Sequence, residues 1–172
     1  MIKAEYISHM GGDLTVVNSA RVSFAKESQL SLAGMLEDQD SKLIQYLAKH
    51  NHFSPFTHPQ ITLRETVPIF VARQRFKHVV GFTYNEVSRR YVSDEPEFYT
   101  PDVWRSRPEG CVKQGSGGPI QHVRYVDDLY ALFLNAARQT YNGLLEAGVA
   151  PEQARMVLPQ SMLTSYYVTG SL

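Results

Sequence analysis

Apolar and polar positions follow two different periods along the chain, and each period predicts one kind of element. Between Ile61 and Val67, apolar residues alternate with polar ones, which predicts a strand that ends at Pro68. Between Val126 and Leu144, apolar residues recur every three or four positions. That spacing predicts a long amphipathic helix, closed by a glycine at position 148.

Shorter segments predict the remaining elements of the N-terminal half. Residues 2–8 predict an edge strand, and Asp13 is a suitable N-cap for a helix that runs through Val22. Ser41 is the predicted N-cap of a second helix, with its apolar residues between positions 43 and 48. Pro68 suits the first turn of a helix over residues 69–78.

The C-terminal half begins with residues 101–119, which are rich in proline and glycine and predict a mobile surface loop. After the long helix, Pro151 starts a short helix that reaches about residue 158. Residues 163–169 have the β-branched and aromatic composition of a strand. On the long helix, Tyr130, Phe133 and Tyr141 are interpreted as core or subunit contacts.

Composition indicates one soluble globular domain over residues 1–172, with 43% hydrophobic and 20% charged residues. Lys+Arg and Asp+Glu both number 17, so no global basic field favours nucleic acid or an anionic membrane as a partner. The single cysteine, Cys111, is interpreted as incidental and excludes a disulfide framework. No signal peptide or membrane span is evident, so we expect a cytoplasmic protein.

Positive charge is concentrated between Arg73 and Tyr91. This segment contains five of the 17 Lys+Arg residues and one acidic residue, Glu86. On the predicted helix 69–78, Arg73 and Lys77 would share one face. Guanidinium groups bind phosphate through paired hydrogen bonds, so the cluster is suited to an anionic nucleotide. Two alternatives stay open at this point: a solvated surface with ion pairs, and a stacking platform for RNA.

The order of residues in this cluster resembles a signature of the flavin-dependent thymidylate synthases, in which Arg-His-Arg is followed after seven residues by a serine. Lys77-His78-Val79 stands for the first part, and Asn85-Glu86-Val87-Ser88-Arg89-Arg90-Tyr91 matches the second part in full. Four further blocks occur in the family's order: Ala20–Phe24, His50–His58, Pro68–Gln74 and Ala154–Pro159. The five blocks are spread over most of the chain, from Ala20 to Pro159.

The resemblance implies an α/β or α+β fold with a central mixed or antiparallel sheet. The expected strands are the N-terminal one and residues 60–67, 90–99 and 163–169, beside a helical side that contains residues 121–147. It further implies an FAD-dependent methyltransferase that makes dTMP from dUMP, with methylenetetrahydrofolate as carbon donor and NADPH as reductant. Family members are homotetramers whose active sites draw on more than one subunit. A non-catalytic nucleotide- or RNA-binding protein that keeps the basic cluster is the alternative.

The resemblance also implies site residues by position. The expected dUMP-binding residues are Gln74, Arg75, Lys77, Glu86, Val87, Ser88, Arg89, Arg90 and Arg155. The expected FAD-binding residues are Ser54, Lys77, His78, Val79 and Glu86, with His52 as a candidate helper. Ser88 is assigned to binding, because a serine without a base partner is a poor nucleophile. No metal site is expected, since no cysteine or carboxylate cluster completes a shell around His50, His52 and His58.

Two departures from the family pattern bear on catalysis. Lys77 and Val79 replace arginines, and eight residues (80–87) separate Val79 from Ser88, which we expect a local bulge near Gly81 to absorb. The family's strand over 163–169 is followed by more FAD contacts and a catalytic arginine, whereas this sequence stops at Leu172. We therefore expect the sequence to be part of a longer protein or a truncated copy, and no catalytic residue is assigned.

Overall fold

The structure is a computed structural model that describes residues 1–92, 94–110 and 115–171. Its contacts divide the chain into two compact units, each considered by itself. The sheet unit comprises Lys3–Thr66, Gln74–Glu86 and Ser165–Leu172, and the long-helix unit comprises Met1–Ile2, Val67–Arg73 and Val87–Thr164. The expectation of one domain over residues 1–172 stays a prediction.

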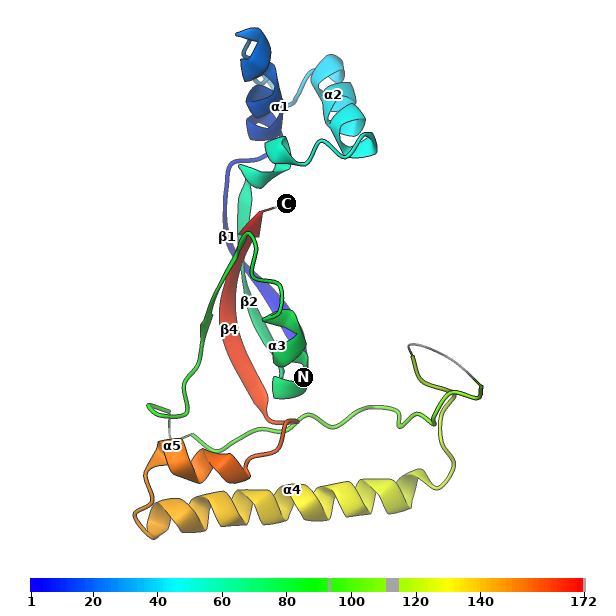
Figure 1. Cartoon of the computed structure of the whole chain (residues 1–172), viewed down its shortest axis with the longest axis vertical. Coiled ribbons are helices and arrows are strands. Elements are labelled where there is room, and N and C mark those ends of the chain that lie inside the picture. The colour runs from blue at the N-terminus through cyan, green and yellow to red at the C-terminus, as the bar shows by residue number, and fades with distance from the viewer. Residues whose placement is uncertain (93, 111–114, 172) are drawn as a thin grey trace. The chain divides into compact units, whose positions relative to one another are not determined.

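Four strands form one sheet in the order β1-β2-β4-β3, with the bounds β1 Lys3–Met10, β2 Gln60–Pro68, β3 Phe82–Glu86 and β4 Leu163–Ser171 (Figure 1). β1 runs antiparallel to β2, and β3 runs antiparallel to β4. Hydroxyl pairs join Thr62 to Thr169 and Thr66 to Ser165, each at 2.9 Å, so β2 and β4 are antiparallel as well. The α+β fold and three of the predicted strands are confirmed.

The fourth strand of the sheet was predicted wrongly. The described residues of the range 90–99 contribute one isolated bridge, between Phe98 and Met162, and β3 at Phe82–Glu86 takes the sheet position instead. Pro96 has no backbone N–H, which makes a strand there costly. In β3, Phe82 and Tyr84 point to one face and are half-buried, the alternation that a strand with one covered face requires.

Two helices of the sheet unit pack side by side: α1 at Asp13–Arg21 and α2 at Asp38–Lys49 (Figure 1). Val16, Val17 and Leu47 are buried on these two helices. Short 3-10 turns follow at Val22–Phe24 (η1) and Ser54–Thr57 (η2). Together they hold residues 20–24 and 50–58, two of the blocks on which the family resemblance rests, within the same unit.

Both predicted N-caps in this region were wrong by one or more residues. The caps are Gly12 for α1 and Glu37 for α2, so Asp13 and Ser41 lie inside their helices. For α2, the acidic first turn explains the earlier start, since carboxylates are stabilised near the positive end of the helix dipole. As a consequence, Asp40 is a helical residue that faces inward and is buried.

The long-helix unit contains α4 at Val123–Glu146, which confirms the predicted long helix, and α5 at Pro151–Ala154 with the 3-10 turn η3 at Arg155–Val157. α5 and η3 lie against α4 (Figure 1). Ala137, Tyr141 and Ala154 are buried in this unit. Within residues 101–119, the described positions form no helix or strand, and Cys111 lies outside the described residues.

α3 at Ile69–Arg75 joins the two units and ends three residues earlier than predicted. The turn that follows, Phe76–Gly81, leads into β3, and Gly81 has a φ of +74°, a value that favours glycine. We call this segment the α3–β3 turn. Lys77 and His78 therefore lie on a turn, and the prediction that Arg73 and Lys77 share a helix face was wrong.

Candidate functional site

A groove of the sheet unit lies between α1, α2 and η2. It has a volume of about 950 Å³. It is lined by Ser19, Ala20, Arg21, Ser23, Phe24, Gln39, Lys42, Leu43, Tyr46, Leu47, His52, Ser54 and Pro55. Two residues that the resemblance implied, His52 and Ser54, thus line one groove together with the Ala20–Phe24 block. We call it the α1–α2 groove.

Aromatic rings are stacked on the α2 side of this groove. The ring of Tyr46 lies 4.3 Å from that of His50 and 6.1 Å from that of His52, between ring centroids, and the second pair is nearly parallel at 19°. Rings packed in this offset way hold each other's orientation. His52 is therefore held against Tyr46 at the edge of the groove, while its side chain stays exposed.

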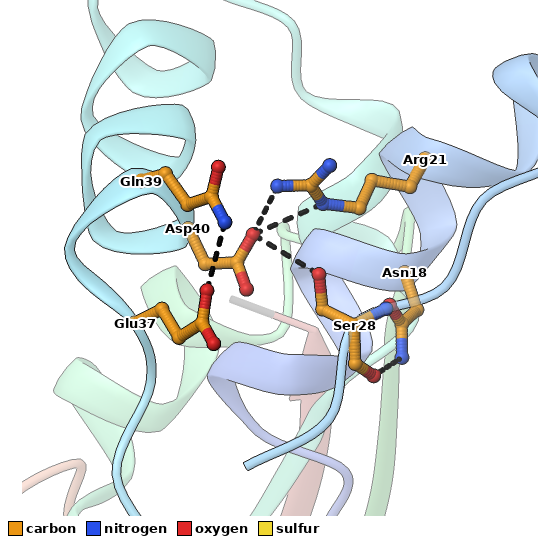
Figure 2. Close-up of polar contacts among 6 residues, drawn as sticks. All are labelled: Asn18, Arg21, Ser28, Glu37, Gln39 and Asp40. Atoms are coloured by element: carbon orange, nitrogen blue, oxygen red, sulfur yellow. Dashed lines mark hydrogen bonds and ion pairs between the residues drawn. The ribbon is translucent and has the colours of Figure 1, made fainter. Parts of the chain in front are cut away.

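A buried ion pair fixes the wall between this groove and a neighbouring hollow (Figure 2). Asp40 is 1% exposed, and its Oδ1 accepts hydrogen bonds from the Nε of Arg21 at 3.0 Å and from its Nη2. The hydroxyl of Ser28 donates to the same oxygen at 3.1 Å. A buried carboxylate is tolerated when it is paired and hydrogen-bonded in this way.

The loop after α1 is tied back to the helix beside that ion pair. The side chain of Asn18 donates to the carbonyl of Ser28 at 3.0 Å and accepts from its N–H at 2.7 Å (Figure 2). These two bonds pair both polar groups of the Ser28 backbone. They hold Ser28 where its hydroxyl donates to Asp40. The loop, α1 and α2 are thus fastened around one carboxylate.

Arg75, one of the predicted dUMP ligands of the sheet unit, has an acidic partner and aromatic neighbours. Its Nε lies 3.4 Å from the carboxylate of Glu65, and its guanidinium lies 4.9 Å from the centre of the Phe82 ring. Gln74, Lys77, His78, Val79 and Glu86 are exposed. None of these five residues lines the α1–α2 groove, so the predicted FAD residues fall in two places within the unit.

Tyr166 on β4 completes a polar network beneath Arg75. Its hydroxyl donates to Oε2 of Glu65 at 2.5 Å. Burial of the side chain raises the pKa of Tyr166 well above its usual range, and the hydrogen bond to Glu65 raises it further. Tyr166 therefore stays a neutral donor that holds Glu65 in place for Arg75.

Four of the remaining predicted dUMP ligands, Val87–Arg90, follow β3 and belong to the long-helix unit. The Nη1 of Arg89 donates to the carbonyl of Asp94. The Oγ of Ser88 accepts from the N–H of Arg90 at 3.3 Å and from its Nε at 3.4 Å. The hydroxyl oxygen thus faces an arginine, which cannot act as a base, and the assignment of Ser88 to binding stays a prediction.

Arg155, the last predicted dUMP ligand, lies in the same unit at the start of η3. Its Nε donates to the carbonyl of Glu152 at 3.3 Å, and the side chain is exposed. This bond uses one of the five N–H donors that a guanidinium has. Arg90 and Arg155 both keep donors for an anion.

Sequence reasoning missed Arg21, Asp40 and Tyr46 as parts of a site. The signal for Arg21 was present, because it stands in the Ala20–Phe24 block, but no role was assigned to that block. Asp40 gave no local signal, since its partner lies 19 residues away in sequence. Among the residues that the structure describes, no group of His, Cys, Asp and Glu is placed to hold a metal ion. No helix in the described ranges combines the length and apolarity needed to cross a bilayer.

Solved structures of a nucleotide methylase are similar to this chain. The UMP/dUMP methylase PolB from Streptomyces cacaoi bound with 5-Br dUMP superposes with a TM-score of 0.85 at 32% identity, covering 99% of this chain and 74% of that one. The same enzyme bound with 5-Br UMP gives a TM-score of 0.82. At this identity the likeness extends beyond the fold to sequence.

Comparison by sequence finds relatives that are flavin-dependent thymidylate synthases. The flavin-dependent thymidylate synthase of Thermotoga neapolitana is 41% identical over 165 residues, which cover 96% of this chain and 68% of the relative. That of Tropheryma whipplei (strain TW08/27) is 38% identical over 172 residues, 98% of this chain and 70% of the relative. The Thy1 family, described as thymidylate synthase complementing protein, matches residues 5–172. The chain therefore belongs to the Thy1 family, the family of the flavin-dependent thymidylate synthases.

Proposed function

We propose that this chain is an FAD-dependent thymidylate synthase that converts dUMP to dTMP. The observation that carries the proposal is the 41% identity to a flavin-dependent thymidylate synthase along nearly the whole chain. The likeness to a UMP/dUMP methylase bound with 5-Br dUMP supports a uridine nucleotide as substrate. Two exposed arginines of the long-helix unit, Arg90 and Arg155, offer hydrogen-bond donors that suit that nucleotide's phosphate.

The proposed reaction balances with two co-substrates. One dUMP, one methylenetetrahydrofolate, one NADPH and one proton give dTMP, tetrahydrofolate and NADP⁺. The carbon comes from the folate and the two electrons from NADPH, and bound FAD would supply the redox step between them. No cysteine nucleophile is needed in this scheme, and the residues of the chain bind, orient and shield the reactants.

The α1–α2 groove fits the requirements of a flavin. Its volume of about 950 Å³ falls in the range of small-molecule sites, about 300–1,000 Å³. Phe24, Leu43 and Tyr46 offer apolar and aromatic surface for a planar ring, and Ser54 offers a hydroxyl. Arg21 and Lys42 bring positive charge to the same groove. We propose that Ser54 binds FAD here and that His52 assists transfer at the edge of the groove.

The other proposed contacts lie on the α3–β3 turn and beyond it. Lys77, His78, Val79 and Glu86 would contact FAD. Val79 has no polar side chain, so its contact would come from the backbone. Of the dUMP ligands that the resemblance implies, we propose Gln74, Lys77, Glu86–Arg90 and Arg155. A cation such as Lys77 beside a reduced flavin stabilises its anionic form, which is the contribution we assign to the turn.

The proposal is tested by adding FAD and then dUMP to the purified chain. Flavin absorbance should appear with the protein after desalting, and dUMP should then perturb the flavin spectrum because the two ligands would bind near each other. A protein that stays colourless, or a flavin spectrum unmoved by saturating dUMP, contradicts the proposal. Salt-sensitive binding of single-stranded RNA without flavin binding would support the non-catalytic alternative.

We further propose that the chain forms a homotetramer whose active sites draw on more than one subunit. An apolar stripe on α4 supports self-association. Tyr125, Leu129, Leu132 and Phe133 lie on one side of the helix and are 70%, 54%, 67% and 52% exposed. Contiguous exposed apolar surface of this kind marks an interaction site. Tyr141, in contrast, is buried in the core. A core contact was one of the two roles predicted for it, the other being a subunit contact.

Charges placed in the stripe are expected to break the assembly. The double variant Leu129→Glu, Leu132→Glu should shift the mass measured by light scattering from four chains to one or two, because unpaired carboxylates would be buried in the interface. The control variant Asn135→Glu, Asn142→Glu places the same charges at exposed positions on another side of α4. An equal mass for both variants would argue against this interface.

A further inference from the structure

The α3–β3 turn carries three of the proposed FAD contacts, yet its side chains from Lys77 to Val80 are exposed and give it little packing. Backbone bonds tie the turn to its neighbours at both ends: the N–H groups of Lys77 and His78 donate to Gln74 at 3.2 Å and Arg75 at 3.1 Å, and the carbonyl of Val79 accepts a long bond from Phe82 at 3.5 Å. A turn with few buried contacts opens easily. Its conformation must therefore come from groups outside the turn.

Tyr84 on β3 supplies the most direct of these groups. Its hydroxyl lies 2.9 Å from the carbonyl oxygen of His78 and 3.2 Å from that of Arg75. One hydroxyl proton is thus shared between the end of α3 and the middle of the turn. The ring of Tyr84 is packed edge-on against Phe76 at 4.9 Å and against Tyr166 at 6.0 Å, so the hydroxyl cannot swing away freely.

Arg75, the last residue of α3, is anchored to β2 and β3 directly before the turn. Its guanidinium is paired with Glu65 at 3.4 Å and lies over the rings of Phe82 and Tyr84 at 4.9 and 5.9 Å. Glu65 is itself held by Tyr166. Arg75 is less exposed than Lys77 or His78, and its charge already has a counter-ion and aromatic faces. These contacts are those of a packing residue and leave its charge largely compensated.

From this geometry we propose that Tyr84 and Arg75 are positioning residues that hold the α3–β3 turn in the conformation that binds FAD, and that Arg75 is not a ligand of the dUMP phosphate. The role in FAD binding rests on the proposed function, while the support of the turn does not. Arg75 is therefore not a nucleotide ligand, although the resemblance implied one there, and the role of Glu65 is to hold Arg75 in place.

The variant Tyr84→Phe removes one oxygen atom and keeps the ring. We expect the amides of Lys77 and His78 to exchange with deuterium faster by about 3- to 10-fold in the ligand-free chain, and the Kd for FAD to rise by about the same factor, as the loss of one hydrogen bond implies. The matched control is Tyr167→Phe, whose exposed tyrosine lies on the adjacent strand. Unchanged amide exchange and unchanged FAD affinity in Tyr84→Phe would overturn the inference.

The variant Glu65→Gln separates the two roles of Arg75. If Arg75 supports the turn, removing its counter-ion should speed exchange at Lys77 and His78 and weaken FAD binding, with no gain in dUMP affinity. If Arg75 is instead a phosphate ligand restrained by Glu65, the variant should bind dUMP more tightly, and that result would overturn the inference. Wild-type protein that binds no FAD would refute the proposed function alone, because the exchange measurement still decides whether the turn is held.

Discussion

Replacing Arg21 with methionine is expected to lower the free energy of unfolding by about 3–5 kcal/mol, the cost of leaving a buried charge without its partner. Asp40 is 1% exposed, and Arg21 supplies two of the three hydrogen bonds to its Oδ1. Methionine keeps much of the length of the arginine side chain, so the loss comes from the charge rather than from a cavity. Urea unfolding followed by circular dichroism measures the change.

A second variant shows whether the buried charge is the cause. The double replacement Arg21→Met, Asp40→Leu removes both charges and should recover most of the lost stability, since a buried ion pair and an apolar pair of similar size are often equivalent. Lys26→Met is the control, because Lys26 is exposed beside the same loop and should change stability by less than about 0.5 kcal/mol. An Arg21→Met variant as stable as this control would show that the ion pair between Arg21 and Asp40 does not stabilise the fold.

Removing Arg90 or Arg155 is expected to weaken dUMP binding by about 10- to 100-fold, because each guanidinium would lose charge-assisted hydrogen bonds to the phosphate. The Kd for FAD should change by less than about threefold, since neither residue is among the proposed FAD contacts. Titration of Arg90→Ala and Arg155→Ala with each ligand measures both effects. Each side chain is exposed, so the fold should tolerate the change.

The control for these variants is Arg124→Ala, an exposed arginine in the first turn of α4. It removes the same charge from the same unit but lies outside the proposed site. Small and equal effects of all three variants on dUMP would refute the assignment of Arg90 and Arg155. A loss of FAD binding as large as the loss of dUMP binding would show that the two arginines do not distinguish the ligands.

Much of the fold could be predicted where the apolar pattern was long and regular. The period of three to four over residues 126–144 predicted α4, and the alternation at 61–67 predicted β2. β3 was missed because Phe82 and Tyr84 were treated as part of the basic cluster, although their alternation is strand-like. The strand predicted at residues 90–99 relied on the family's topology, and the proline at position 96 opposes it.

The candidate site could be predicted only where its residues stand in recognisable blocks. His52 and Ser54 were found through such a block, and both line the α1–α2 groove. Contacts between distant positions could not be predicted, because no local pattern records them. Asp40 meets Arg21 across 19 residues, and Tyr166 meets Glu65 across 101. The support of the α3–β3 turn likewise depends on three-dimensional packing that spacing in the sequence does not reveal.

The measurement that tests the central claim most directly is the formation of dTMP by the folded chain. The assay contains dUMP, methylenetetrahydrofolate, NADPH and FAD, and product is separated from substrate by chromatography. We expect dTMP in excess of the protein concentration, and its loss when any one of the four components is omitted. Protein that is folded and loaded with FAD but forms no more dTMP than a mixture without protein would contradict the claim.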